Sequence, residues 1–155
     1  MPNIRQIGIW GEQFVAHWLH SQGWQIIQHQ YRTRWGEIDL IGISPSDTII
    51  IFVEVKTRSD RNWDSDGLLA ITPTKQKKLI ISAQWFLSQH PELADYYGRF
   101  DVALVRWQGD KSSMSTQTQP MSHHFSHPIS IPQPIHCPEG DLTLQQYIES
   151  AFCSS

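Results

Sequence analysis

Residues 35–56 have the sequence WGEIDLIGISPSDTIIIFVEVK, and this stretch decides the fold. Its first part alternates well enough for a strand, and residues 48–56 are rich in β-branched side chains, as in a buried central strand. The four residues 44–47, Ser-Pro-Ser-Asp, are typical of a turn. The stretch therefore predicts a β-hairpin in which Ile43 pairs with Thr48.

Apolar spacing on both sides of the hairpin predicts the rest of an α/β domain over residues 1–107. Gly23 indicates the end of a first helix, Thr72 and Pro73 the start of a second, and Pro91 its stop. The predicted elements are a helix over 8–20, strands over 24–32, 35–43 and 48–56, a helix over 72–90 and a strand over 99–107.

The composition changes after residue 107. Residues 108–140 are rich in Ser, Gln, Pro and His, which predicts a low-complexity loop or linker. The histidines in it have no matched cysteine pair, so they favour no specific metal site; they are His123, His124, His127 and His136. Apolar residues then return with helical spacing, and we expect a C-terminal helix over 141–155 that docks on the domain.

The bulk composition fits one ordinary domain. Charged residues make up 17% of the 155 residues, and the net charge of −3 gives no global indication of a nucleic-acid partner. The sequence has no basic-then-apolar leader and no apolar run long enough to cross a bilayer. We therefore expect a cytoplasmic protein without a membrane partner. Nothing in the spacing of Cys137 and Cys153 requires a disulfide.

Side-chain parity gathers charged residues on one face of the hairpin. Residues two apart in a strand share a face, so Glu54 and Lys56 lie together, as do Glu37 and Asp39. The expected register makes Asp39 and Glu54 diagonal neighbours, with backbones roughly 7–8 Å apart. A solvated ion pair is the alternative, but the strand that carries Glu54 is apolar enough to favour burial.

Carboxylates that face each other across strands are destabilising unless a cation lies between them. Asp39 and Glu54 are therefore predicted metal ligands, and Mg²⁺ or Mn²⁺ suits them. Such an ion would polarise a phosphoryl oxygen, and Lys56 would stabilise the developing charge. Glu12, which leans toward the apolar side of its helix, is a further catalytic candidate, and Glu37 and Gln76 are supporting candidates.

Basic side chains between residues 32 and 78 predict contacts with phosphate. Three lysines stand in the first turns of the second helix, where the helix dipole disfavours cations. Trp35 and Trp63, in expected loops, could stack on bases or pack internally. The predicted nucleic-acid-binding residues are Arg32, Arg34, Arg58, Lys75, Lys77 and Lys78.

Several motifs in order resemble the YraN family, whose members are expected to be endonucleases. They are Gly11-Glu12, Gly36-Glu37-Ile38-Asp39, Phe52-Val53-Glu54-Val55-Lys56, Lys75, Arg99-Phe100-Asp101 and the C-terminal residues 148–152. The resemblance implies a restriction-endonuclease-like core, a mixed central sheet flanked by helices, of the PD-(D/E)XK superfamily. It also implies that Asp39 is the first metal ligand, that Glu54 and Lys56 are the acid-x-lysine element, and that Glu12 is the acid of relatives that act on branched DNA.

The preferred hypothesis is a Mg²⁺- or Mn²⁺-dependent DNA endonuclease, acting on duplex, branched or repair intermediates. The alternative is a non-catalytic module on the same fold that binds nucleic acid or protein. The sequence leaves open a homodimer or a protein partner.

Overall fold

The structure is a computed structural model that describes residues 2–59, 71–109, 135–137 and 139–153. Predicted features outside these ranges include Trp63 and most of the 108–140 segment with His123, His124 and His127. The elements are α1 (Ile4–Ser21), β1 (Gln25–Arg32), β2 (Glu37–Ser44), β3 (Ile49–Ser59), α2 (Pro73–Ser88), the 3-10 helix η3 (Pro91–Leu93), β4 (Tyr97–Gly109), β5 (Ile135–Cys137) and β6 (Gly140–Phe152).

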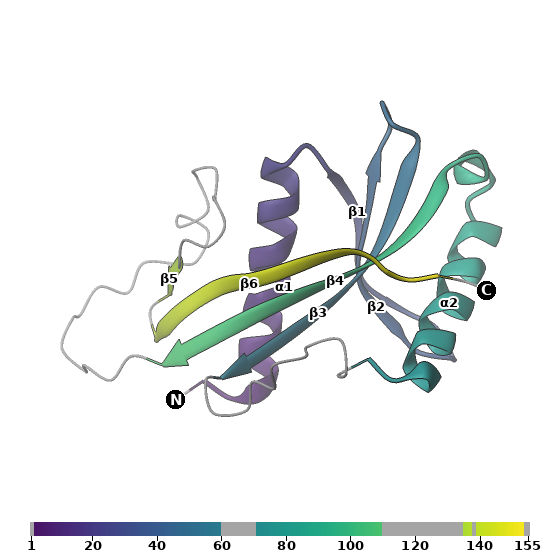
Figure 1. Cartoon of the computed structure of the whole chain (residues 1–155). Helices are drawn as coiled ribbons and strands as arrows, with labels where there is room; N and C mark the ends of the chain where they lie inside the picture. Colours follow the sequence, from purple (N-terminus) through teal and green to yellow (C-terminus); the bar gives the residue numbers. More distant parts are fainter. Residues whose placement is uncertain (1, 60–70, 110–134, 138, 154–155) are drawn as a thin grey trace.

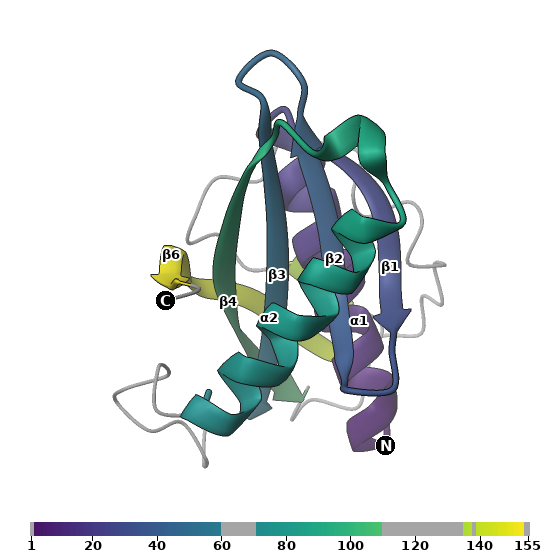
Figure 2. The same ribbon diagram turned by 90° about the vertical axis from the view of Figure 1, so that its right-hand side faces the viewer.

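A mixed six-stranded sheet forms the centre of the molecule, in the order β1-β2-β3-β4-β6-β5. β3 and β4 are parallel and the other neighbours are antiparallel. The parallel pair needs a crossover, and α2 lies in it. α1 covers one face of the sheet and α2 the other (Figures 1 and 2). The predicted α/β fold, a mixed sheet flanked by helices, is confirmed.

Both helices predicted within residues 1–107 are confirmed, and side chains cap their first turns. The side chain of Asn3 accepts a hydrogen bond at the start of α1, which begins four residues earlier than the expected residue 8. Gly23, just past its end, has a φ of +96°, a conformation that glycine adopts without strain. Thr72 caps α2 and Pro73 is its first residue, as predicted. In the part of the chain that the structure describes, neither helix is long and apolar enough to span a membrane.

The hairpin is confirmed, but its register differs from the predicted one by two residues. Ile43 pairs with Ile50 instead of Thr48. Thr48 has a φ of 56° and belongs to the turn, while Ser44 stays in β2. A shift of two residues keeps every side chain on its face, so the parity argument survives. Phe52 accordingly packs in the core under α2, as residues 51, 53 and 55 pack under α1.

The predicted C-terminal helix is wrong, because residues 140–152 form the strand β6. β6 pairs with β4 along its length and satisfies an edge that would otherwise expose unpaired backbone groups. Leu142 and Leu144 alternate with polar residues as a strand requires. Further along, register shifts and a φ of 49° at Ser150 break the alternation. These irregularities give the apolar residues a spacing that resembles a helix.

A buried carboxylate fastens β6 to β4. Asp101 is 1% exposed and accepts hydrogen bonds from the guanidinium of Arg99, from the hydroxyl of Tyr147 at 2.6 Å and from the backbone N–H of Ser150 at 3.0 Å. Burial and the neighbouring Asp101 charge raise the pKa of the Tyr147 hydroxyl, which therefore stays a donor. Both oxygens of the buried carboxylate thus accept hydrogen bonds from more than one donor, as burial of a charge requires.

Candidate metal-dependent active site

Asp39 lies where β2 and β3 part. The paired residues of the hairpin end at Leu40 and Val53, and the same register continued by one step sets Asp39 across from Glu54. Oδ2 of Asp39 accepts a hydrogen bond from the N–H of Val55 at 2.7 Å. The carboxylate thus replaces a strand carbonyl at the point where the two backbones separate.

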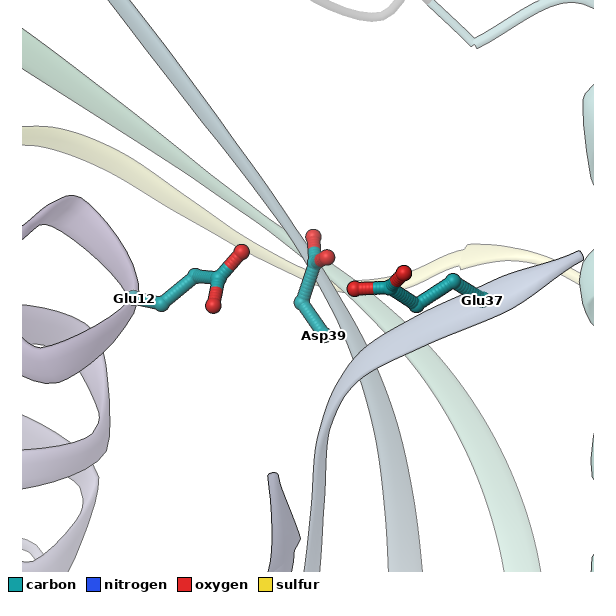
Figure 3. Close-up of side chains that lie close together, drawn as sticks. All are labelled: Glu12, Glu37 and Asp39. Atoms are coloured by element: carbon teal, nitrogen blue, oxygen red, sulfur yellow. The ribbon is translucent and has the colours of Figure 1, made fainter. Parts of the chain in front are cut away.

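Three carboxylates lie close together beside the point where β2 and β3 separate, and we call them the carboxylate trio. They are Glu12 from α1, and Glu37 and Asp39 from β2; one oxygen atom of each lies within 4.8 Å of the other two (Figure 3). Asp39 lies between the other two side chains, which reach it from opposite sides (Figure 3). α1 approaches closely because it carries a glycine before Glu12: a Cβ on Gly11 would clash with the hydroxyl of Thr57 on β3.

The trio is short of positive charge. Burial, the nearby Glu54 and, to a smaller extent, Glu12 raise the pKa of Asp39 to about 8, although the hydrogen bond from Val55 opposes this. Burial also raises the pKa of Glu12, although a hydrogen bond from the Gln30 amide, at 2.9 Å, opposes this. A proton or a cation is therefore needed to neutralise the trio at neutral pH.

Glu54 lies beside the trio with two lysines. It is 5% exposed, and Oε1 forms ion pairs with Nζ of Lys56 at 3.2 Å and with Nζ of Lys75 on α2. Burial and the neighbouring Lys75 lower the pKa of Lys56. Burial would lower the pKa of Lys75 as well, but its contacts with Glu54 outweigh this and raise it. One buried carboxylate thus holds two ammonium groups at the edge of the trio.

The other predicted residues divide into near and distant ones. Arg32 pairs with Glu37 at 3.1 Å, so it lies at the rim of the trio. The Gln76 amide donates to the carbonyl of Ile71, and its expected supporting role stays a prediction. Arg58 is exposed on β3 and donates to the carbonyl of Thr57. The remaining predicted phosphate contacts, Arg34, Lys77 and Lys78, are exposed and outside the cluster.

Sequence reasoning missed two contacts. Lys75 was expected only as a phosphate contact, yet its side chain reaches Glu54. Gln30, which holds Glu12, was not singled out at all. It has a φ of 48°, unusual for a residue with a side chain, and this bend in β1 turns its amide toward α1. The only indication of these contacts in the sequence was Lys75 itself, a cation in the first turn of α2, where the helix dipole disfavours it.

A mixed sheet with a helix on each face, with Asp39, Glu54 and Lys56 on its central hairpin, is an α/β fold compatible with a restriction-endonuclease-like core. The chain belongs to the YraN family: the model of this family, described as uncharacterised protein family UPF0102, matches residues 11–105. The match begins within α1, includes the hairpin and α2, and ends within β4.

Known relatives extend the similarity over most of the chain. A UPF0102 protein of Acaryochloris marina is 47% identical over 154 residues, which cover 95% of this chain and 90% of the relative. One from Synechocystis is 43% identical over 151 residues, with 96% and 99% covered, and one from Trichodesmium erythraeum is 42% identical over 157 residues, with 94% and 87% covered. These names describe no activity, so the function has to be argued from the site.

Proposed function

We propose that this chain is an endonuclease that hydrolyses phosphodiester bonds of DNA with Mg²⁺ or Mn²⁺ as its cofactor. One observation carries the proposal: the carboxylate trio lies beside a buried carboxylate that holds two lysines. Anionic oxygens suit a divalent cation, and ammonium groups suit the phosphate that such a cation would help to bind.

The donor set fits a hard divalent cation. Its three oxygen atoms lie within 4.8 Å of one another, and carboxylate oxygen is the ligand that Mg²⁺ and Mn²⁺ prefer. Asp39, Glu12 and Glu37 would hold the ion, and Glu54 would complete the negative side of the site. When bound, the ion supplies polarisation of a phosphoryl oxygen and lowers the pKa of a water molecule.

The lysines have separate roles in the proposed reaction. Lys56, half-buried on β3, donates to a phosphoryl oxygen and stabilises the charge that develops there during hydrolysis. Lys75 acts through Glu54: its ion pair orients that carboxylate, so it is a positioning residue. Gln30 has the same kind of role for Glu12, because its amide fixes one oxygen of that carboxylate.

The test is cleavage of supercoiled, single-stranded and branched DNA by the purified chain with Mg²⁺, with Mn²⁺ and with EDTA. Metal-dependent cutting is expected, and Asp39→Asn, Glu54→Gln and Lys56→Ala should each reduce its rate at least about 100-fold, the loss typical of removing one charge-stabilising group. Asp95→Asn is the matched control, since Asp95 is exposed and outside the site. Lys75→Ala should lower the rate and Lys75→Arg should restore part of it.

Cutting that survives both Asp39→Asn and Glu54→Gln would show that the nuclease lies elsewhere or is a contaminant. Binding of DNA that needs no metal, with no cutting of any substrate, would favour the alternative of a non-catalytic binding module. Calorimetry separates these cases, because only the enzyme should bind Mn²⁺ in a way that Asp39→Asn abolishes.

A further inference from the structure

A stripe of side chains runs along α2 from the proposed active site to the outer surface. Lys75, Lys78, Ser82 and Trp85 are three or four residues apart, so they lie on one side of the helix. Lys75 contacts Glu54 at one end, and Trp85 at the other end is 47% exposed. The helix rises about 15 Å between these two residues.

The turn between β1 and β2 lies along the same stripe. The hydroxyls of Thr33 and Ser82 are 2.8 Å apart. The ring of Trp35 is 5.9 Å from that of Trp85, and the guanidinium of Arg34 lies 4.5 Å from the centre of the Trp35 ring. Glu37 of the trio begins β2 directly after this turn, so both the turn and the helix lead from the aromatic pair to the active site.

The charge of α2 differs sharply from that of the chain. The helix contains three lysines and no Asp or Glu, while the whole chain has a net charge of −3. Lysines near the start of a helix oppose its dipole, so their placement does not serve the helix itself. Lys77 and Lys78 are exposed, and Lys78 stands between the active site and the aromatic pair. Positive charge beside an exposed aromatic ring is the combination that binds a nucleic-acid strand without reading its sequence.

We propose that this surface binds a single-stranded segment of the DNA substrate. We call it the Trp85 track and define it as Arg34, Trp35, Lys78 and Trp85. Ser82 is buried and holds the β1–β2 turn against α2 through its contact with Thr33. An unpaired base stacks on the exposed ring of Trp85, which Trp35 supports from one side, and phosphates along the strand contact Lys78 and Arg34. The helix rises about 10 Å from Lys78 to Trp85 and a stacked strand rises about 3.4 Å per nucleotide, so the track takes about three nucleotides.

This inference rests on the proposed function and narrows its substrate to DNA with unpaired bases close to the cut. The phosphates of a blunt duplex can contact the lysines, but its base faces are stacked on one another. No base face is then free to stack on a tryptophan. A protein partner could cover Trp85 and the neighbouring Ile81, which is 38% exposed. The line of cations that continues to Glu54 favours a polyanionic strand instead.

Binding is tested by fluorescence anisotropy in EDTA at one fixed salt concentration, with labelled oligothymidylate, a blunt duplex and a duplex with a single-stranded arm. The first and third should bind more tightly than the blunt duplex. Trp85→Ala should weaken them between about 5-fold and 150-fold, the equivalent of one stacked base. Trp85→Phe should keep most of the affinity, and Tyr97→Ala is the matched control. Tyr97 is 68% exposed and pairs with Ile49, at the far end of β3 from Glu54.

Equal affinity for the three DNA forms would overturn the inference, as would a Trp85→Ala variant that retains its circular dichroism and its affinity for oligothymidylate. A Trp85→Ala variant with unchanged DNA affinity and an altered sedimentation mass would assign the surface to self-association, which also overturns it. The measurement needs no cleavage. Absence of cutting with intact, Trp85-dependent binding would therefore count against the nuclease proposal and leave the track supported.

Discussion

Replacing Asp39 by asparagine is expected to stabilise the folded chain at neutral pH. Burial and Glu54 raise the pKa of Asp39 from 3.8 to about 8. Between these two pH values the folded chain binds more protons than the unfolded chain, so the free energy of unfolding falls as the pH rises. Asparagine removes the titrating charge and keeps a carbonyl oxygen for the N–H of Val55.

The size of the effect follows from the pKa of about 8. When the folded chain binds one proton more than the unfolded chain, the free energy of unfolding falls by about 1.4 kcal/mol for each pH unit. The largest possible loss between about pH 5 and pH 7 is therefore about 2.7 kcal/mol. Asp39 is only partly buried, and solvent screening reduces the expected difference between wild type and variant to roughly 1–2 kcal/mol. Below about pH 4, Asp39 is protonated in both the folded and the unfolded chain, so it causes no pH-dependent difference between wild type and variant. Above about pH 8 it is ionised in both, and the difference no longer grows.

The assay is urea unfolding, followed by tryptophan fluorescence, at a series of pH values in EDTA. The difference in unfolding free energy between Asp39→Asn and wild type should grow from acid to neutral pH, while Asp95→Asn tracks wild type. Adding Mg²⁺ should stabilise wild type and not Asp39→Asn, because a ligand stabilises only the state that binds it. A difference that is constant from pH 5 to pH 8 would refute the raised pKa and with it the electrostatic argument for the site.

Two further predictions concern the scaffold. Gly11→Ala should destabilise the chain by about 1–3 kcal/mol in urea unfolding, because its new methyl group meets the Thr57 hydroxyl; Gly8→Ala, where nothing lies within 4 Å, should be neutral or slightly stabilising, and an equal loss in both would contradict the packing argument. Asp101→Ala should cost about 3–5 kcal/mol, because it leaves the largely buried Arg99 with only its longer contact to the exposed Glu149; a loss below about 1 kcal/mol would mean that β6 is held by other contacts.

The sequence allowed the hairpin and its charged face to be predicted because both depend on local rules. Alternation, β-branched content and a turn between two strands are properties of neighbouring residues. The two-residue error in register came from Thr48, whose left-handed backbone nothing in the sequence required. It did no harm, since only an odd shift would have moved Asp39 and Glu54 to opposite faces.

The contacts that complete the site depend on distant segments. Whether Lys75 reaches Glu54 depends on where α2 crosses the sheet, and no local pattern encodes that position. The same holds for β6, because its identity as a strand was decided by the free edge of β4 and not by its own apolar spacing. Gln30 needed a bend within β1 to face Glu12, and such a bend leaves no compositional trace.

The negative charge of the site is balanced only if additional positive charge binds there. The fold itself needs little from Asp39, since asparagine could equally receive the N–H of Val55. Four carboxylates lie together with two lysines, and Arg32 adds little because it is largely exposed. A divalent cation would offset this excess of negative charge, and Lys56 would then be available to a phosphate. Natural proteins keep such destabilising arrangements where they serve a reaction. The cost of the trio therefore supports a catalytic role more strongly than a structural one.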